Sequence, residues 1–198
     1  MQKINDMDCS ILNKKIPFVQ AASSVYKQVP VGRSIQIIVI HSMEAPEKGY
    51  TAEAVANYFK NGSGGRYASA HYNIDNDSIV QSVQTRDIAY GAKGVNSIGI
   101  HLEHAGYARQ TRAEWLDPYS RKMLENSACL CAQVLMPKFN IPARWLTASD
   151  LKRARWDKSI KGITSHAEAS RAFNPGGHTD PGKGFPIDIY LQMIINRL

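Results

Sequence analysis

The sequence predicts a single α/β domain in which helices flank a mixed central β-sheet. Stretches rich in β-branched residues alternate with stretches of helical periodicity, which is typical of this fold class. Two of the strand-like stretches are separated only by Asn76-Asp77 and indicate a hairpin, so the sheet should contain an antiparallel pair. A chain of 198 residues with 43% hydrophobic residues is long and apolar enough for one buried core.

The N-terminal stretch is expected to be an addition to this domain. It has a mixed composition and closes with Val29-Pro30-Val31-Gly32, a cluster of residues that interrupt regular structure. We therefore expect residues 1–34 to form an extension packed on the domain, and residues 35–198 to form the domain itself.

Four stretches predict the strands. Residues 35–41 are almost continuously apolar and β-branched, as in a central strand buried on both faces, and they end in His41. Residues 70–75 and 78–83 are the two arms of the expected hairpin. Residues 97–103 form the remaining strand.

The strand at residues 97–103 has one polar face. Its period of two places Gly99, His101 and Glu103 on one side and apolar residues on the other. The polar face must therefore meet water or a functional site. His104, just beyond it, is expected to face solvent.

Four helices are predicted. Residues 51–60 carry an amphipathic stripe, and residues 119–136 form a longer core helix that Pro137 helps to end. A shorter basic helix begins at residue 148, and apolar periodicity predicts a last helix over residues 186–198.

The charge of the chain restricts its partners. Its 24 Lys and Arg residues against 17 Asp and Glu residues give a formal charge of +7, which fits nucleic acid, anionic lipid or an acidic cell-wall polymer. No base-reading or phosphate-cradling motif supports nucleic acid. The longest apolar run, residues 37–40, is too short for stable membrane insertion. Six basic residues between positions 144 and 161 fit either a solvated helix face or an electrostatic contact with an anionic envelope polymer.

Two further observations bear on the compartment. Residues 1–10 lack the basic and apolar regions of a secretory signal, so the sequence favours a protein that is made without one. Cys9, Cys129 and Cys131 are too few for a disulfide framework, and we expect all three to be free thiols in a reducing compartment.

Histidines mark a candidate site. His41 ends a buried strand, and His166 lies on a stretch, rich in Pro and Gly, that also contains Asp180. Two imidazoles and a carboxylate are a ligand set of catalytic zinc, which His41, His166 and Asp180 would supply. Against this, a histidine at a strand end is commonly structural, and Asp-Pro-Gly is by itself a good turn.

Four motifs, in order along the chain, resemble those of one family. They are Ile38-Val-Ile-His-Ser-Met-Glu44, Ser69-Ala-His-Tyr-Asn-Ile-Asp75, Ser97-Ile-Gly-Ile100 and His178-Thr-Asp-Pro-Gly-Lys-Gly-Phe-Pro186. Together they look like the signatures of the zinc-dependent N-acetylmuramoyl-L-alanine amidases of type 2. That family includes phage endolysins, bacterial muropeptide amidases and animal peptidoglycan recognition proteins, and the resemblance implies their fold.

The resemblance implies Zn²⁺ as cofactor and assigns its ligands. His41 matches the first ligand and Asp180 the third. His166 stands where the second ligand usually lies in a Gly-His-x-Asp motif, although Ser165 replaces the Gly and Glu168 the Asp.

His178 has two candidate roles. The separation of His166 and Asp180 is longer than the commonest family spacing, so His178 is an alternative second ligand. The family often carries a Lys at the position of His178 to bind the developing oxyanion, and a histidine can donate the same hydrogen bond.

The sequence does not single out one general base. Bacterial members commonly read Ile-Gly-Ile-Glu-Leu-Glu and use the first Glu, whereas this chain has His101 at that position and Glu103 two residues later. Either His101 acts as the base, or Glu103 reaches the water, or the substitution cripples hydrolysis and leaves a binding protein.

The substrate groove departs from the family as well. Relatives often have Trp-His where this chain has Tyr90-Gly91, so Tyr90 is expected to form an apolar wall of the groove. His71 lies in a motif of the hairpin strand, and a structural role is favoured over a catalytic one.

The resemblance therefore implies an N-acetylmuramoyl-L-alanine amidase that cuts the bond between N-acetylmuramic acid and L-alanine. A monomeric phage-type endolysin acting on bacterial peptidoglycan is the favoured setting, held in the host cytoplasm before release to the cell wall. The alternatives are a cytoplasmic amidase that recycles anhydro-muropeptides and a non-catalytic peptidoglycan-binding module.

Overall fold

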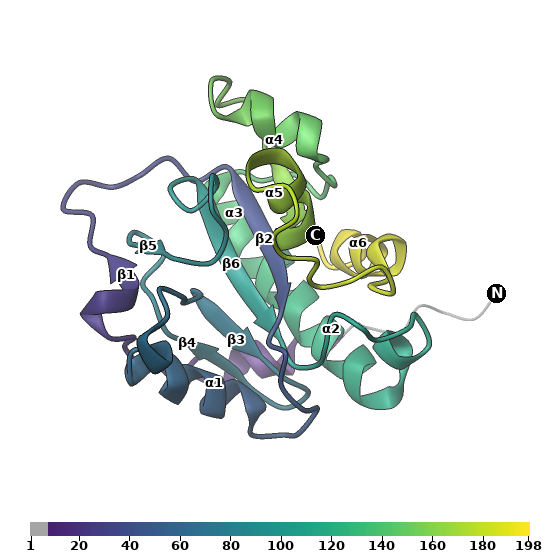
Figure 1. The fold of residues 1–198 in the computed structure, drawn as a ribbon. Helices are drawn as coiled ribbons and strands as arrows, with labels where there is room; N and C mark the ends of the chain where they lie inside the picture. Colours follow the sequence, from purple (N-terminus) through teal and green to yellow (C-terminus); the bar gives the residue numbers. More distant parts are fainter. Residues whose placement is uncertain (1–7) are drawn as a thin grey trace.

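The central sheet has the strand order β4-β3-β6-β2-β7 within residues 8–198, the part of the chain that the computed structural model describes (Figure 1). Strands β3, β6, β2 and β7 are parallel, and β4 is antiparallel to β3. This confirms the predicted mixed sheet and hairpin. The strands are β2 Ile37–Ser42, β3 Tyr72–Ile74, β4 Ile79–Gln81, β6 Gly99–His104 and β7 Gly162–Ser165.

Helices cover both faces of this sheet, which confirms the predicted α/β class. They are α1 Thr51–Lys60, α2 Pro118–Leu130, α3 Met136–Phe139, α4 Ala148–Ala154, α5 His166–Phe173 and α6 Ile187–Ile195. Short 3₁₀ turns lie at Ser10–Asn13, Ser23–Val25, Ser63–Gly65 and Glu114–Leu116, and β1 (Tyr26–Lys27) pairs with β5 (Ile88–Ala89) in a separate two-stranded sheet.

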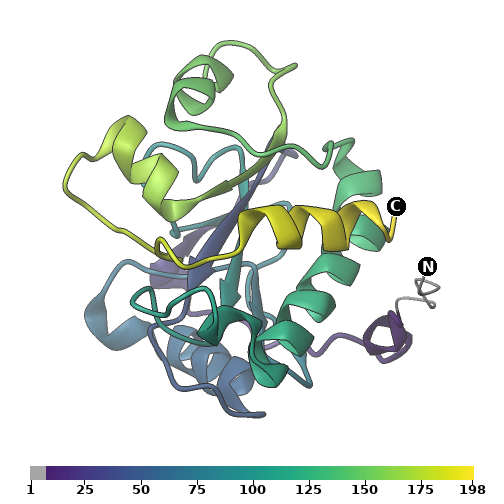
Figure 2. The same ribbon diagram turned by 90° about the vertical axis from the view of Figure 1, so that its right-hand side faces the viewer.

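Strand β2 is the centre of the core. All six of its residues are buried, because alternate side chains meet a helical layer on each face. Ile38 and Ile40 belong to the larger core cluster, with residues of α2 and α6, whereas Ile37 and Val39 pack with residues of α4 and α5. Figure 2 shows α6 lying across α2 on the first of these faces. The β2 side chains that point to the other face therefore lead towards α5 and its loop.

The long core helix extends further than expected. The helical path runs from α2 through a π turn at Cys131–Leu135 into α3, and it ends at Asn140 with a left-handed φ of 51°. Pro137 lies inside α3 instead of helping to end the helix. Proline lacks an N–H and crowds the carbonyl four residues earlier, and the wider π turn before it accommodates this defect.

Residues 162–173 are more regular than the sequence suggested. No strand or helix was predicted here, but the segment contains β7 and α5, and the Ser165 side chain caps α5 by accepting a hydrogen bond from the Glu168 N–H. A Ser followed three residues later by a Glu is a known helix-start pattern, so a sequence signal for α5 was present.

The stretch before β2 contacts the edge of the sheet. Val19 N–H donates to the Gln81 carbonyl, Gln81 N–H donates to the Pro17 carbonyl, and Ala21 N–H donates to the Ser82 carbonyl. Residues 1–7 of the expected extension lie outside the described residues, and the domain boundary at residue 34 stays a prediction.

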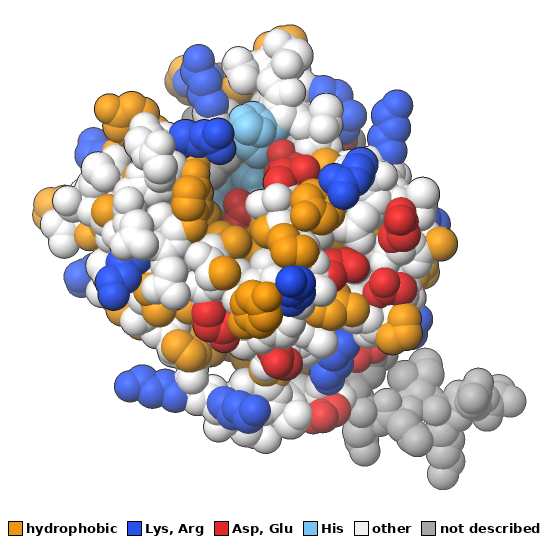
Figure 3. Space-filling model, turned by 60° about the horizontal axis from the view of Figure 1, so that its bottom comes forward, with side chains coloured by type: hydrophobic (Ala, Val, Ile, Leu, Met, Phe, Trp, Pro, Cys, Tyr) orange, Lys and Arg blue, Asp and Glu red, His pale blue; other side chains and the backbone are white. Residues whose placement is uncertain are grey.

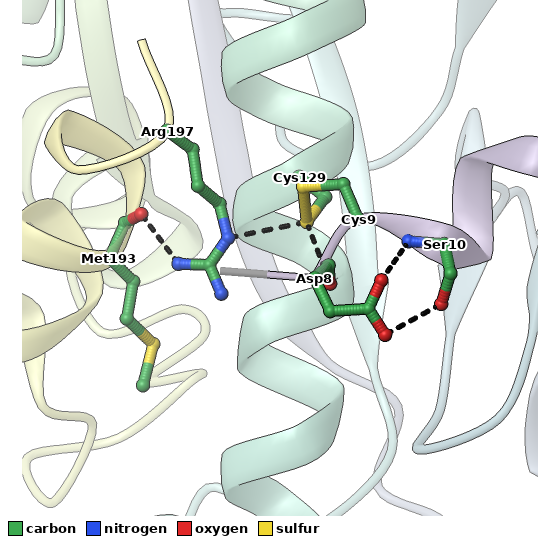
Figure 4. Close-up of a disulfide and its surroundings, with 6 residues drawn as sticks. All are labelled: Asp8, Cys9, Ser10, Cys129, Met193 and Arg197. Atoms are coloured by element: carbon green, nitrogen blue, oxygen red, sulfur yellow. Dashed lines mark hydrogen bonds between the residues drawn. A yellow bond between two sulfur atoms is a disulfide. The ribbon is translucent and has the colours of Figure 1, made fainter. Parts of the chain in front are cut away.

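The cysteine prediction was wrong. Cys9 and Cys129 form a disulfide, which ties the N-terminal stretch to α2, and Cys131 is the free, buried thiol (Figure 4). In Figure 4 the Arg197 side chain from the end of α6 points to the same disulfide, with its Nε 3.2 Å from Cys129 Sγ. The pairing joins residues 120 apart in sequence, so no local pattern could reveal it. The three cysteines therefore no longer argue for a reducing compartment.

No helix among residues 8–198 has the length and apolar character needed to cross a membrane.

We predict that Cys9→Ser lowers the free energy of unfolding by about 2–4 kcal/mol, because it removes a cross-link that restricts the conformations of the unfolded chain. Denaturant titration checks this, and reduction of the wild type should lower its stability to the level of the variant. Thiol titration of the unfolded, unreduced wild type should find Cys131 alone. Three reactive thiols before reduction would contradict the disulfide.

Candidate metal centre and catalytic pocket

Three side chains meet at the carboxyl ends of neighbouring parallel strands. His41 lies near the end of β2, and His166 follows directly on β7, which pairs with β2. Asp180 comes from the loop between α5 and α6 and bridges the two imidazoles: its Oδ2 is 3.1 Å from His41 Nδ1 and its Oδ1 is 3.1 Å from His166 Nδ1. The fold thus brings together the three residues proposed from the sequence as ligands.

This cluster is suited to a metal ion. One ligand atom from each residue lies within 4.8 Å of the others, and within residues 8–198 it is the one such group of three or more His, Cys, Asp or Glu side chains. Each residue is at least nine-tenths buried. Two imidazole nitrogens and a carboxylate oxygen are the donor set of many catalytic zinc sites, which keep one position open. The residues present fit zinc.

The surroundings favour an ionised Asp180 carboxylate and a neutral His41 imidazole. Burial opposes ionisation of Asp180, but hydrogen bonds with His166 and His41 outweigh it and hold the Asp180 pKa below its usual value. Burial lowers the pKa of His41, which keeps its ring neutral. Metal ligands need these protonation states.

His178 lies at the exposed edge of the cluster. Its ring stacks on that of His166 with the centroids 4.1 Å apart, and its Nδ1 is 3.7 Å from Asp180 Oδ1. Its side chain is 66% exposed, against 10% for His166. The buried position thus belongs to His166, and His178 faces the space in front of the cluster.

A pocket of about 580 Å³ opens in front of these residues. Figure 3 looks onto this hollow: pale-blue histidine side chains lie in it, acidic side chains lie beside them, and Lys and Arg side chains stand at its rim. Tyr90 lines the pocket, and so does Glu103, together with His41 and Asp180. Arg66 and Lys93 supply the cations of the lining.

His101 and Glu103 share a strand face but occupy different depths. In the β2–β6 register, Glu103 pairs with His41. His101 pairs with Val39, two residues further from the carboxyl end of the strand. Glu103 therefore reaches the pocket. His101 is fully buried and does not line it.

His101 contacts the rear nitrogen of His41. Its Nδ1 is 3.0 Å from His41 Nε2, the nitrogen that faces away from Asp180. Gly91 makes room for this imidazole, since a Cβ at Gly91 would lie 2.4 Å from His101 Nδ1. Two departures from the family pattern, Gly91 and His101, are thus linked by packing.

Glu103 has the environment of a proton acceptor with a raised pKa. Its Oε2 is buried, and no group among residues 8–198 hydrogen-bonds to it. Burial, with smaller contributions from Asp180 and Glu44, raises the Glu103 pKa well above its usual value.

His71 and Arg33 support β6 from behind. His71 Nδ1 accepts the His101 N–H at 2.9 Å, so its Nε2 carries the proton and donates to the Asp87 carbonyl at 3.2 Å. Arg33 donates to the carbonyl groups of Gly99 and Thr85. The geometry of His71 is that of a structural residue. Sequence reasoning missed Arg33, because a single Arg before a strand carries no signal.

The expectation for His104 was wrong. It is fully buried: its Nδ1 donates to the His41 carbonyl at 3.1 Å, and its Nε2 accepts from Ser127 of α2 at 2.8 Å. Strand β6 runs one residue further than predicted, so the period of two places His104 on the apolar face with Leu102. Burial lowers the His104 pKa to about 4.

Comparison with known proteins agrees with this fold. The family model of N-acetylmuramoyl-L-alanine amidase matches residues 31–183. The chain therefore belongs to the N-acetylmuramoyl-L-alanine amidase family, and its enzyme class is the one that the motifs implied. No curated protein matches the chain.

Solved structures share the fold at low sequence identity. The catalytic domain of XlyA aligns with a TM-score of 0.64 and 18% identity, over 91% of this chain and 99% of that one. Staphylococcus aureus hydrolase AmiA, in complex with its ligand, gives 0.61 and 20%, over 98% and 91%. The N-acetylmuramoyl-L-alanine amidase LysC from Clostridium intestinale URNW gives 0.58 and 17%, over 93% and 99%.

Proposed function

We propose that the protein is a zinc-dependent amidase that hydrolyses the bond between N-acetylmuramic acid and L-alanine of peptidoglycan. The observation that carries this proposal is the His41–His166–Asp180 cluster at the floor of an open pocket, in a chain of the amidase family. Zinc at such a site acts as a Lewis acid that polarises a carbonyl oxygen and makes water more acidic.

Glu103 is the proposed general base. Its carboxylate lines the pocket beside His41, and its Oε2 is free to accept a proton from the attacking water. His101 is fully buried behind His41 and has no access to the pocket, so its geometry argues against the base role. A carboxylate in the pocket also argues against a silent binding module.

The remaining pocket residues have simpler roles. His178, exposed in front of the cluster, is positioned to donate a hydrogen bond to the oxyanion. Tyr90 holds the substrate from the side wall.

His101 orients His41. A neutral imidazole carries one proton, so a His41 that uses Nδ1 as a ligand must carry it on Nε2 and donate it to His101 Nδ1. Such a partner fixes both the tautomer and the ring plane of a metal-ligating histidine. The Glu-to-His exchange thus replaces a pocket residue by a positioning residue, while Glu103 keeps a carboxylate in the pocket.

The proposed biological role is a monomeric phage-type endolysin, which is held in the host cytoplasm and then reaches the wall. The Cys9–Cys129 disulfide supports action outside the reducing cytoplasm and weighs against a cytoplasmic recycling enzyme. The positive charge supports adsorption to an acidic wall polymer.

We predict that the zinc-loaded wild type releases new amino termini from purified peptidoglycan, and that Glu103→Gln lowers kcat by about 10²- to 10⁴-fold. Zinc content should be unchanged, because Glu103 is not one of the proposed ligands. Amino-group assay and metal analysis provide the two readouts, with Glu47→Gln, outside the pocket, as the matched control. A wild type that releases no amino termini contradicts the function, and a fully active Glu103→Gln contradicts the base assignment.

We predict that His101→Leu raises the zinc Kd by about 10- to 100-fold. His101→Asn should keep a zinc Kd close to that of the wild type, because the Asn Oδ1 replaces the accepting nitrogen. Chelator competition measures the Kd, and thermal unfolding of the metal-free proteins controls for folding. Gly91→Ala should weaken zinc binding too, because its Cβ displaces the His101 ring. Equal affinities for the Leu and Asn variants would refute the positioning role.

A further inference from the structure

Trp156 is the most exposed large hydrophobic side chain among the described residues, and only Tyr67 and Val31 are nearly as exposed. It lies in the turn after α4 with 85% of its surface exposed. Tryptophan usually buries its large ring, and aromatic side chains that stay outside a core are enriched at binding surfaces. The Trp156 ring is therefore available for contact with a partner.

The surroundings of Trp156 are strongly basic. Residues 144–161 contain six Lys and Arg against two Asp, a formal charge of +4 out of +7 for the chain. Arg153 pairs with Asp150, but no carboxylate among residues 8–198 lies within ion-pair distance of Arg155 or Lys158. These two cations are available to an anionic partner.

Arg155 links Trp156 to the rim of the catalytic pocket. Its guanidinium lies 5.9 Å from the centroid of the Trp156 ring and 5.5 Å from that of Phe173, the last residue of α5. The Phe173 ring packs on Gly94, where a Cβ would approach it to 2.4 Å. Gly94 and Lys93 line the pocket. Trp156, Arg155 and Phe173 thus form a line of side chains that reaches the pocket rim at Gly94, here called the aromatic strip.

We propose that the aromatic strip is a second binding site for the polymeric substrate, outside the catalytic pocket. This inference rests on the proposed function. A glycan strand with carboxylate-bearing peptides combines apolar sugar faces, which pack on aromatic rings, with anions, which pair with Arg and Lys. While one repeat occupies the pocket, a neighbouring repeat reaches the strip.

Two contacts on one polymer have a specific kinetic consequence. The second contact becomes intramolecular once the first is made, so it strengthens binding of a long strand without affecting a short one. The strip should therefore promote action on the intact wall and contribute nothing on soluble fragments, which is the preference of a lytic enzyme and the opposite of a recycling one.

The test is the double variant Trp156→Ala/Arg155→Gln, assayed on intact sacculi and on a soluble fragment of one disaccharide-peptide. We expect kcat/KM to fall at least about tenfold on sacculi and to stay unchanged on the fragment. Lys48→Gln/Tyr50→Ala is the matched control: Tyr50 is 60% exposed, Lys48 Nζ lies 5.7 Å from its ring centroid, and neither residue lines the pocket. The control should behave as the wild type on both substrates.

Cosedimentation with sacculi gives a second readout that needs no turnover, so it decides the question even if the wild type proves inactive and the proposed function fails. We expect the double variant, and not the control, to lose binding. The proposal would be overturned if the double variant bound sacculi as the wild type does, or if its kcat/KM fell equally on sacculi and on the fragment. Unchanged sacculus binding with lost binding to phosphatidylglycerol vesicles would overturn it in favour of a lipid surface.

Discussion

The His41 imidazole is held from both of its nitrogens, and the candidate site is arranged around this one ring. Asp180 lies against Nδ1 and His101 against Nε2. Each partner is delivered by a separate part of the fold: β6 pairs with β2 and supplies His101, whereas the loop after α5 supplies Asp180. Parallel pairing of β7 with β2 then fixes His166 beside them. The site depends on this register, because a shift by one residue would turn these side chains to the other face of the sheet.

The sequence predicts those features that depend on local periodicity and on the ends of strands. The buried strand ending near His41, the helix at residues 51–60, the hairpin and the shared face of His101 and Glu103 all follow from spacing. Features set by tertiary packing do not. Spacing cannot tell that Glu103 reaches the pocket while His101 stays beneath it, and it cannot pair Cys9 with Cys129 across 120 residues.

The departures from the family pattern are better understood together than singly. Taken alone, His101 in place of a Glu suggests a damaged active site. The structure connects it with Gly91, whose missing side chain leaves the space that the imidazole fills, and with Glu103, which keeps a buried carboxylate at the pocket. Behind them, His71 and Arg33 hold β6 by accepting from and donating to its backbone. A coordinated rearrangement of this kind is consistent with a site that retains hydrolytic chemistry.

The most direct test of these roles is a crystal structure of the zinc-loaded protein, with anomalous scattering measured at the zinc edge. We expect one peak, bound by His41 Nδ1, His166 Nδ1 and an Asp180 oxygen, with the Glu103 carboxylate facing its open side and His101 still on His41 Nε2. A peak bound by His178 in place of His166, or one that draws His101 or Glu103 into the ligand set, would contradict the roles assigned to these residues.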